Sequence, residues 1–182
     1  MKLVESGFRR VRTECDRFHS YLIQHGAARM AMLGGLCVGS YLFFAHFIIN
    51  SVKVVGASMT PTLCDGDTRI LHRWALLYRE PRPGEMVVLK DPRHHDFAVK
   101  RIIAGPRDIV LVREGIVYVN GKKLAEPYLS PRSRTDCGDL PQHVFEVRKN
   151  EYFVLGDNRQ NSEDSRSYGA VPKDCILGLI QL

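Results

Sequence analysis

The chain begins with a long apolar run and then changes to short runs of alternating or β-branched apolar residues. Met30 to Asn50 contains no formally charged residue. About 20 such residues, each rising about 1.5 Å in a helix, match the hydrocarbon thickness of a bilayer. A core helix of this length without charge is uncommon in a small domain, and a cleavable signal peptide has a shorter apolar region with a small-x-small exit. We therefore predict a retained single-pass anchor over residues 30–50.

The segments on the two sides of this span differ in charge. Residues 1–29 combine apolar side chains at roughly helical spacing with six basic residues, whereas residues 51–65 contain one basic residue, Lys53. Basic residues favour the cytoplasmic side of a membrane span. The pattern predicts a cytoplasmic segment over 1–29, able to form an amphipathic helix on the membrane surface, with Ser51 onward across the membrane. Three acidic residues in 1–29 argue against a cleaved organelle-targeting peptide.

The remainder of the chain has the pattern of a β domain. Asn120-Gly121 suits a two-residue hairpin turn, Trp74–Tyr78 is expected to bridge two strands, and residues 128–144 are expected to form a long surface loop. About 130 residues are enough to bury a core of their own. We therefore predict a mainly β domain over residues 51–182, with strands at Thr68–His72, Met86–Lys90, Phe97–Ile103, Asp108–Val112, Ile116–Val119, Tyr152–Leu155 and Ile176–Ile180.

Composition excludes several classes of function. The formal charge is +6, but the Lys and Arg residues are scattered and no nucleic-acid-binding motif accompanies them, so we expect no nucleic-acid partner. The five cysteines form no C-x-x-C pair and lack a histidine at metal-ligand spacing, so we expect no metal and no cofactor. Cys64, Cys137 and Cys175 could form a disulfide in an oxidising compartment, and the sequence leaves their pairing open.

Two residues are candidates for catalysis. Ser58 lies in V-V-G-A-S-M-T-P-T-L, between small or apolar neighbours, although a loop serine is usually a turn former or helix cap. Lys100 lies in the apolar strand A-V-K-R-I-I, where alternation places it on a face with Ala98 and Ile102. An edge strand with solvated cations is the simpler interpretation. If the lysine is buried, its pKa falls and it can accept the proton of a serine hydroxyl.

A polar block follows the strand at 152–155. Gly156 to Gly169 reads G-D-N-R-Q-N-S-E-D-S-R-S-Y-G and returns directly to an apolar segment. An exposed hydrophilic loop has a similar composition, but this one is placed as if it were wedged beneath the core. Buried charges must be paired, and Asp164 with Arg166 or Arg101 would satisfy this requirement.

Four ordered blocks resemble those of the type I signal peptidases: G-A-S-M-T-P-T-L, P-G-E-M-V-V-L, F-A-V-K-R-I-I and the polar block. The resemblance runs from about residue 30 to the C-terminus. It implies a largely antiparallel β catalytic domain with an apolar surface that dips into the membrane. It also implies a Ser/Lys endopeptidase that removes signal peptides from exported preproteins by cutting after small residues in Ala-x-Ala sites.

The resemblance also implies roles for individual residues. Some relatives place a serine two positions before the nucleophile as a second oxyanion donor; here that position is Gly56, so the second donor stays open. The substrate is expected to bind as an extended strand. The matching residues are catalytic Ser58 and Lys100, dyad-supporting Ser162, Asp164, Arg166 and Arg101, and Val54, Met59, Leu63 and Val99, which would line shallow substrate pockets.

Several alternatives share parts of this pattern. SOS-repressor autoproteases would need a DNA-binding domain and a self-cleavage site, and neither is visible. Conjugative-transfer peptidases, mitochondrial inner-membrane peptidase subunits and a catalytically dead membrane scaffold stay open. We expect a monomer that acts on preprotein signal peptides at a lipid bilayer. The bacterial cytoplasmic membrane is the favoured location and the mitochondrial inner membrane the alternative.

Overall fold

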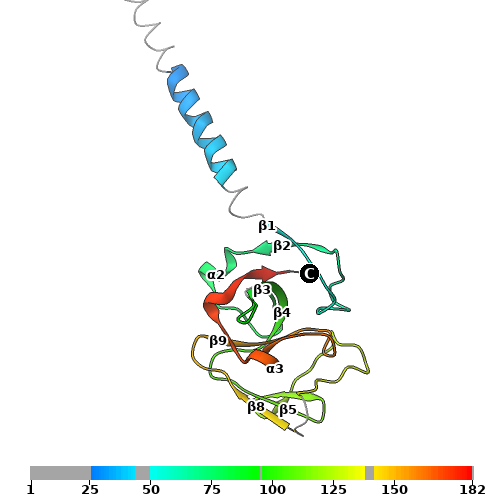
Figure 1. The fold of residues 1–182 in the computed structure, drawn as a ribbon. Coiled ribbons are helices and arrows are strands. Elements are labelled where there is room, and N and C mark those ends of the chain that lie inside the picture. The colour runs from blue at the N-terminus through cyan, green and yellow to red at the C-terminus, as the bar shows by residue number, and fades with distance from the viewer. Residues whose placement is uncertain (1–25, 44–49, 95, 138–141, 182) are drawn as a thin grey trace, which may run out of the picture. The chain divides into compact units, whose positions relative to one another are not determined.

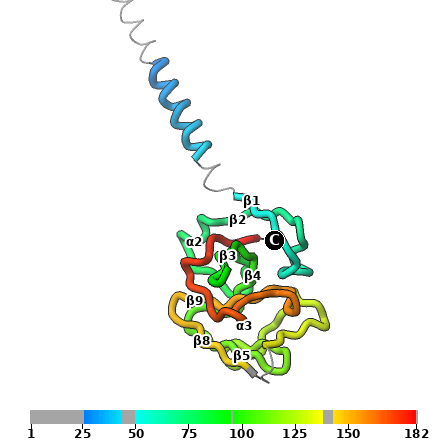
Figure 2. Tube along the Cα trace, viewed as in Figure 1, coloured from blue at the N-terminus to red at the C-terminus, as the bar shows by residue number. Residues whose placement is uncertain are grey.

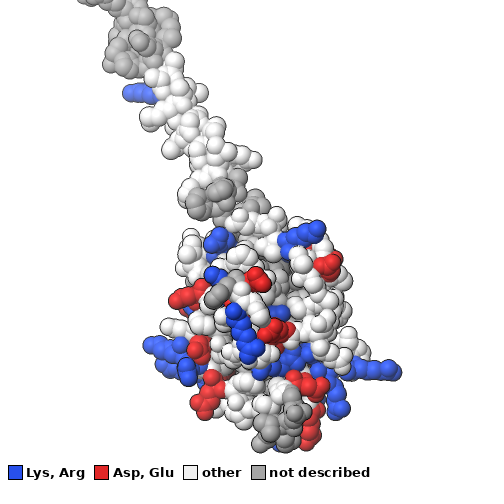
Figure 3. Space-filling model, in the orientation of Figure 1, with Lys and Arg blue, Asp and Glu red and all other residues white. Residues whose placement is uncertain are grey.

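A computed structural model describes residues 26–43, 50–94, 96–137 and 142–181. The chain divides into two units, Met1–Phe47 and Ile48–Leu182. The described part of the first unit is a helix over Gly26–Phe43 that is long and apolar enough to cross a membrane. Arg29 is its only charged residue, and Figure 3 shows the helix almost free of blue and red.

The predicted anchor and this helix differ in their limits. The helix includes residues 26–29, which we expected to precede the anchor, while Asn50, expected to end it, lies in strand β1 (Asn50–Lys53). The apolar run extends to Ile49 and adjoins β1, so hydrophobicity alone could not show where the strand begins. Residues 44–49 of the predicted anchor, and residues 1–25 with their predicted surface helix, lie outside the described residues.

The second unit contains two antiparallel sheets (Figure 1). In Figure 2 the smaller sheet lies at the end of the unit opposite β1 and β2. The larger sheet has the order β1-β2-β11-β3-β4-β9-β10, with β2 Thr68–His72, β3 Met86–Lys90, β4 Phe97–Ala104, β9 Glu151–Leu155, β10 Val171–Pro172 and β11 Ile176–Ile180. The smaller sheet has the order β7-β6-β5-β8, with β5 Ile109–Arg113, β6 Ile116–Val119, β7 Lys122–Lys123 and β8 Gln142–Glu146.

The mainly antiparallel β fold predicted from the sequence is confirmed. The strands at Thr68–His72, Met86–Lys90, Ile116–Val119 and Ile176–Ile180 have the predicted limits. The turn between β6 and β7 is also confirmed: Asn120 and Gly121 have φ values of 51° and 77°, the left-handed conformation that such a hairpin turn requires. The bridge predicted at Trp74–Tyr78 contains a short helix, α2 (Ala75–Tyr78).

The long loop predicted over 128–144 is wrong at its C-terminal end. Strand β8 pairs with β5, placing Val144 opposite Leu111. Phe145 then points to the core, where its ring lies 4.8 Å from that of Phe153. The apolar residues of β8 are few and lie between polar ones. The strand is therefore defined by its pairing with β5 and could not be predicted from its own sequence.

Strand β4 lies between β3 and β9 in the middle of the larger sheet. Lys100 is opposite Val87 of β3, and Arg101 is opposite Leu155 of β9. Both cations are buried, with 4% and 6% of their surface exposed. The interpretation of an edge strand with a solvated Lys and Arg is therefore wrong. Two adjacent charges inside a central strand need dedicated partners, and these define the site.

Candidate active site

Ser58 lies in a compact turn between β1 and β2. The Thr60 N–H donates to Ala57 O at 3.2 Å, and the Leu63 N–H donates to Met59 O at 3.0 Å. The side chains of Met59 and Leu63 are fully buried and anchor this turn in the core. Ser58 itself is half-buried, so its backbone position is fixed while its surface stays accessible.

Asn158, from the polar block, fastens the Ser58 turn. Its backbone N–H donates to Ser58 O at 2.9 Å. Its side-chain amide donates to Ala57 O at 3.0 Å and to Thr60 Oγ1 at 2.9 Å. Two segments that lie about a hundred residues apart in the sequence are thus joined at the serine.

Lys100 contacts the same polar block from β4. Its Nζ donates to Ser162 Oγ at 3.2 Å. Burial lowers the pKa of this lysine, while the charge of Asp164 acts in the opposite direction and does not outweigh it. No direct hydrogen bond joins Lys100 Nζ to Ser58 among the described residues. Catalytic hydrogen bonds are often long in a substrate-free enzyme and tighten when substrate binds.

Gly156 lies where Ser58 and Ser162 come together. A Cβ atom added to Gly156 would lie 2.2 Å from Ser162 Oγ and 2.5 Å from Ser58 O. The Ser162 side chain and the backbone of Ser58 therefore both lie against the same glycine, and Ser162 also contacts Lys100. This contact brings all three predicted residues into one site.

Asp164 and Arg166 form the ion pair that the sequence predicts. Asp164 is fully buried and accepts from Arg166 Nε at 2.8 Å and from the Gly156 N–H at 3.0 Å. It also caps α3 (Ser165–Tyr168) by accepting from the Arg166 N–H. Arg166 in turn donates to Ser162 O at 3.2 Å and Arg159 O at 2.7 Å. The pair therefore holds the backbone on both sides of Ser162.

Arg101 has a different partner from the one considered in the sequence. Its guanidinium binds Asp157 through two hydrogen bonds of 2.8 and 2.6 Å, donates to Gly84 O at 2.7 Å and stacks 4.0 Å from the centre of the Tyr128 ring. The alternative pairing of Arg101 with Asp164 is therefore wrong. Arg101 links the start of the polar block to β4, next to Lys100.

The sequence analysis missed a second buried arginine. Arg159 binds Glu126 and Thr135, and its Nε donates to Gly156 O at 3.1 Å. These partners lie in the segment between β7 and β8, and nothing local in the sequence connects them to the polar block. They clamp that segment against the site.

The four residues expected to line substrate pockets lie together. Val54, Met59 and Leu63 belong to one buried cluster, and Val99 packs against it. Their role in binding stays a prediction. Cys37, Cys64, Cys137 and Cys175 are free, and the described residues contain no cluster suited to a metal ion.

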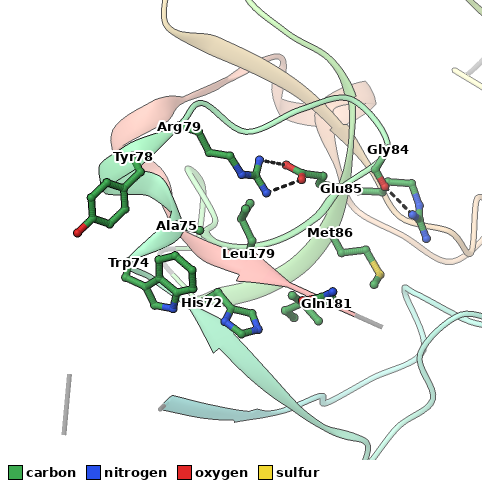
Figure 4. A pocket seen from close by; sticks show the side chains of 12 residues that line it. His72, Trp74, Ala75, Tyr78, Arg79, Gly84, Glu85, Met86, Leu179 and Gln181 are labelled. Atoms are coloured by element: carbon green, nitrogen blue, oxygen red, sulfur yellow. Dashed lines mark hydrogen bonds and ion pairs between the residues drawn. The ribbon is translucent and has the colours of Figure 1, made fainter. Parts of the chain in front are cut away.

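A cavity of about 450 Å³ lies beside α2, and Arg101 is among the residues that line it. Figure 4 shows Trp74, which precedes α2, and Tyr78 of α2 beside it, with the Arg79–Glu85 ion pair across from Leu179. Neither Ser58, Lys100 nor Ser162 lines it.

Comparison with known families decides the class of protein. A family model described as "Signal peptidase, peptidase S26" matches residues 27–182. The chain belongs to this signal peptidase family. The family predicted from the four sequence blocks is thereby confirmed, and so is a peptidase as the class of enzyme.

Individual relatives carry the same family name. The chain is 39% identical to "Probable signal peptidase I-2" of Synechocystis, over 72% of this chain and 61% of that protein. It is 36% identical to signal peptidase I T of Bacillus subtilis (75% and 74%) and 35% identical to signal peptidase IB of Staphylococcus aureus (74% and 76%). A solved signal peptidase I from Enterococcus faecalis is 27% identical with a TM-score of 0.47, over 57% of this chain and 98% of that one.

Proposed function

We propose that this chain is a membrane-anchored type I signal peptidase, in which Ser58 is the nucleophile and Lys100 the general base. The observation that carries the proposal is the buried Lys100 amine, held at 3.2 Å by Ser162, which lies against the same glycine as the Ser58 backbone. A buried amine with a lowered pKa can be neutral, and only a neutral amine can accept a proton.

The chemistry requires two proton transfers for each covalent step. The neutral Lys100 amine takes the proton of the Ser58 hydroxyl as its oxygen attacks the scissile carbonyl carbon. When the C–N bond breaks, the lysine ammonium gives that proton to the leaving amine, and an acyl-serine ester is left. The same amine then deprotonates a water molecule, which hydrolyses the ester, and the proton returns to Ser58 as the acid product leaves.

The tetrahedral intermediate needs donors for its oxyanion. No described residue accepts a hydrogen bond from the Ser58 N–H, so this group is free to donate. Gly56 supplies no side-chain donor, and its N–H already donates to Asp65 Oδ1 at 2.8 Å. In this proposal the oxyanion hole rests on the Ser58 N–H and lacks a serine hydroxyl at position 56.

Preference for small side chains follows from the packing near the serine. Met59 and Leu63 are fully buried and pack with Val54 and Val99, so in this proposal the filled core leaves no room for a deep pocket there. A substrate strand lying over this surface finds only shallow apolar depressions, which suit alanine-sized residues before the cut. Specificity of the Ala-x-Ala type is the expected result.

Membrane attachment is the second part of the proposal. The Gly26–Phe43 helix serves as the anchor, with the basic N-terminal segment inside and the peptidase unit outside a bacterial cytoplasmic membrane. Exposed apolar side chains in α2 and just before it, with Leu77 and Tyr78 each 81% exposed and Trp74 43%, offer a surface suited to the bilayer interface. The matched relatives named above are bacterial, which favours this location.

The test is cleavage of a purified preprotein carrying an Ala-x-Ala site by the full-length chain in detergent. Wild type should cut at that site, and Ser58→Ala and Lys100→Met should each lose at least about 100-fold in kcat/KM. Lys123→Met, in the exposed strand β7 of the other sheet, is the matched control and should keep wild-type activity. Equal activity of all four proteins would reject the dyad, and inactivity of wild type would reject the enzyme.

A further inference from the structure

A polar pocket of about 370 Å³ lies beside the turn that carries the candidate nucleophile. It is lined by Thr60 and Pro61 of the Ser58 turn, by Asn158 and Gln160 of the polar block, and by Ser130, Arg132, Ser133 and Asp157. It contains neither Lys100 nor any of the four residues expected to hold the side chains before the cut. The pocket therefore lies beside the Ser58 turn and is distinct from the surface expected to hold the side chains before the cut.

The charge balance of this pocket favours a negatively charged group. Asp157 is almost fully buried and is already neutralised by the two hydrogen bonds from Arg101. Arg132 is exposed and makes no ion pair or side-chain hydrogen bond with any described residue. The unpaired charge in the pocket is therefore a guanidinium, which binds carboxylates with two parallel hydrogen bonds.

The rest of the lining is suited to a polar peptide. The Asn158 amide is occupied by Ala57 O and Thr60 Oγ1, so it shapes the wall and is not available to a ligand. Gln160 is exposed and has no side-chain hydrogen bond with a described residue, so its amide is available. Pro61 is the only apolar side chain in the lining, which makes the pocket a poor match for the small apolar residues that precede the cut.

The pocket lies within reach of the substrate residues next to the scissile bond. Thr60 is two residues from Ser58, and two residues span at most about 7 Å. Substrate residues within two or three positions of the scissile bond can therefore reach the pocket once the carbonyl is at the serine, and its polar lining favours those after the cut. We propose that this pocket is a subsite for the start of the mature chain and that Arg132 selects an acidic side chain there. The inference rests on the proposed peptidase function.

The experiment compares three preproteins that share one Ala-x-Ala site and carry Glu, Gln or Lys at both the second and third positions after it. Wild type should show the kcat/KM order Glu, Gln, Lys, with roughly a two- to fivefold step from Glu to Gln, as expected for an exposed ion pair. Arg132→Gln should remove the difference between Glu and Gln, and Arg132→Glu should favour Lys. Raising the ionic strength should reduce the wild-type preference.

Arg134→Gln is the matched control. Arg134 is exposed in the same segment but lies beside Gly115 and not in the pocket, so this variant should keep the wild-type order. Equal cleavage of all three substrates by wild type, or an unchanged preference in Arg132→Gln, would overturn the subsite and leave the peptidase intact. Failure of wild type to cut any of the substrates would overturn the peptidase function and the subsite with it.

Discussion

Gly156 leaves open the space that the Ser162 side chain fills, because a Cβ atom at position 156 would lie 2.2 Å from Ser162 Oγ and 2.5 Å from Ser162 Cβ. Real Cβ atoms do not approach other atoms so closely. Ser162, whose side chain contacts Lys100, can thus occupy its position only because residue 156 has no side chain.

Gly156→Ala is predicted to impair catalysis. The added methyl group must displace Ser162 or the Ser58 carbonyl, and overpacking of this kind costs about 1–3 kcal/mol in stability. A displacement of about 1 Å at a catalytic group can lower the rate on the order of 100-fold. Thermal unfolding and kcat/KM on a preprotein substrate measure the two effects.

The control for this substitution is Gly105→Ala. A Cβ at Gly105 would meet its nearest atom, Asp108 Oδ2, at 3.8 Å, and the residue lacks a positive φ. This variant should retain its activity. A fully active Gly156→Ala would show that the close contact at Ser162 does not matter for catalysis.

Breaking the Arg101–Asp157 pair is predicted to destabilise the fold. Asp157→Asn leaves a buried guanidinium without its charge partner, which costs about 3–5 kcal/mol. The double variant Arg101→Met/Asp157→Leu removes both charges and should be more stable than Asp157→Asn alone. Denaturant unfolding of the wild type, Arg101→Met, Asp157→Leu and the double variant gives the coupling energy. Additive effects in this cycle would contradict a buried pair.

Ser162→Ala is predicted to slow the reaction while largely preserving the fold. The substitution removes the hydroxyl that accepts from Lys100 Nζ, so the amine loses its fixed position. We expect kcat to fall on the order of 100-fold with KM little changed. Since Ser162 O binds Arg166 through the backbone, that contact survives the substitution. A parallel loss of stability and activity would instead indicate a purely structural role.

Lys100→Met is predicted to raise thermal stability near neutral pH. Burial lowers the pKa of Lys100 in the folded protein, so the unfolded chain binds this proton more tightly. Wild type therefore gains stability as the pH rises from the lowered pKa to the ordinary lysine value. The Tm advantage of Lys100→Met should be larger at pH 7 than at pH 10. An advantage that grows with pH would contradict the lowered pKa.

Local patterns were sufficient to predict much of this fold. β2, β3, β6 and β11 have their predicted limits because each is a short apolar run bounded by turn residues. The hairpin at Asn120-Gly121 follows from a two-residue turn signal. By contrast, the start of β1 inside the apolar N-terminal run could not be predicted. The strand Asn50–Lys53 is defined by its pairing with β2, which lies further along the chain.

The partners of the buried charges depended on strand register. β9 pairs Leu155 with Arg101, so the residues that follow Leu155 emerge beside Arg101, and Asp157 becomes its partner. Sequence alone offered Asp164, and not Asp157, as a partner for Arg101. The Arg159–Glu126 pair spans 33 positions between two irregular segments, where no periodic pattern exists to predict it. The Asp164–Arg166 pair could be predicted because its two members lie only two residues apart in the sequence.

The central claim is that the folded protein lowers the pKa of the Lys100 amine, so that its neutral form is available as the general base. NMR titration of lysine ε-carbons in the full-length chain in detergent micelles, with Lys100→Met to assign the resonance, measures it directly. We predict that Lys100 titrates below the ordinary range for lysine, in both wild type and Ser58→Ala. Titration of Lys100 at or above that range would contradict its role as the general base.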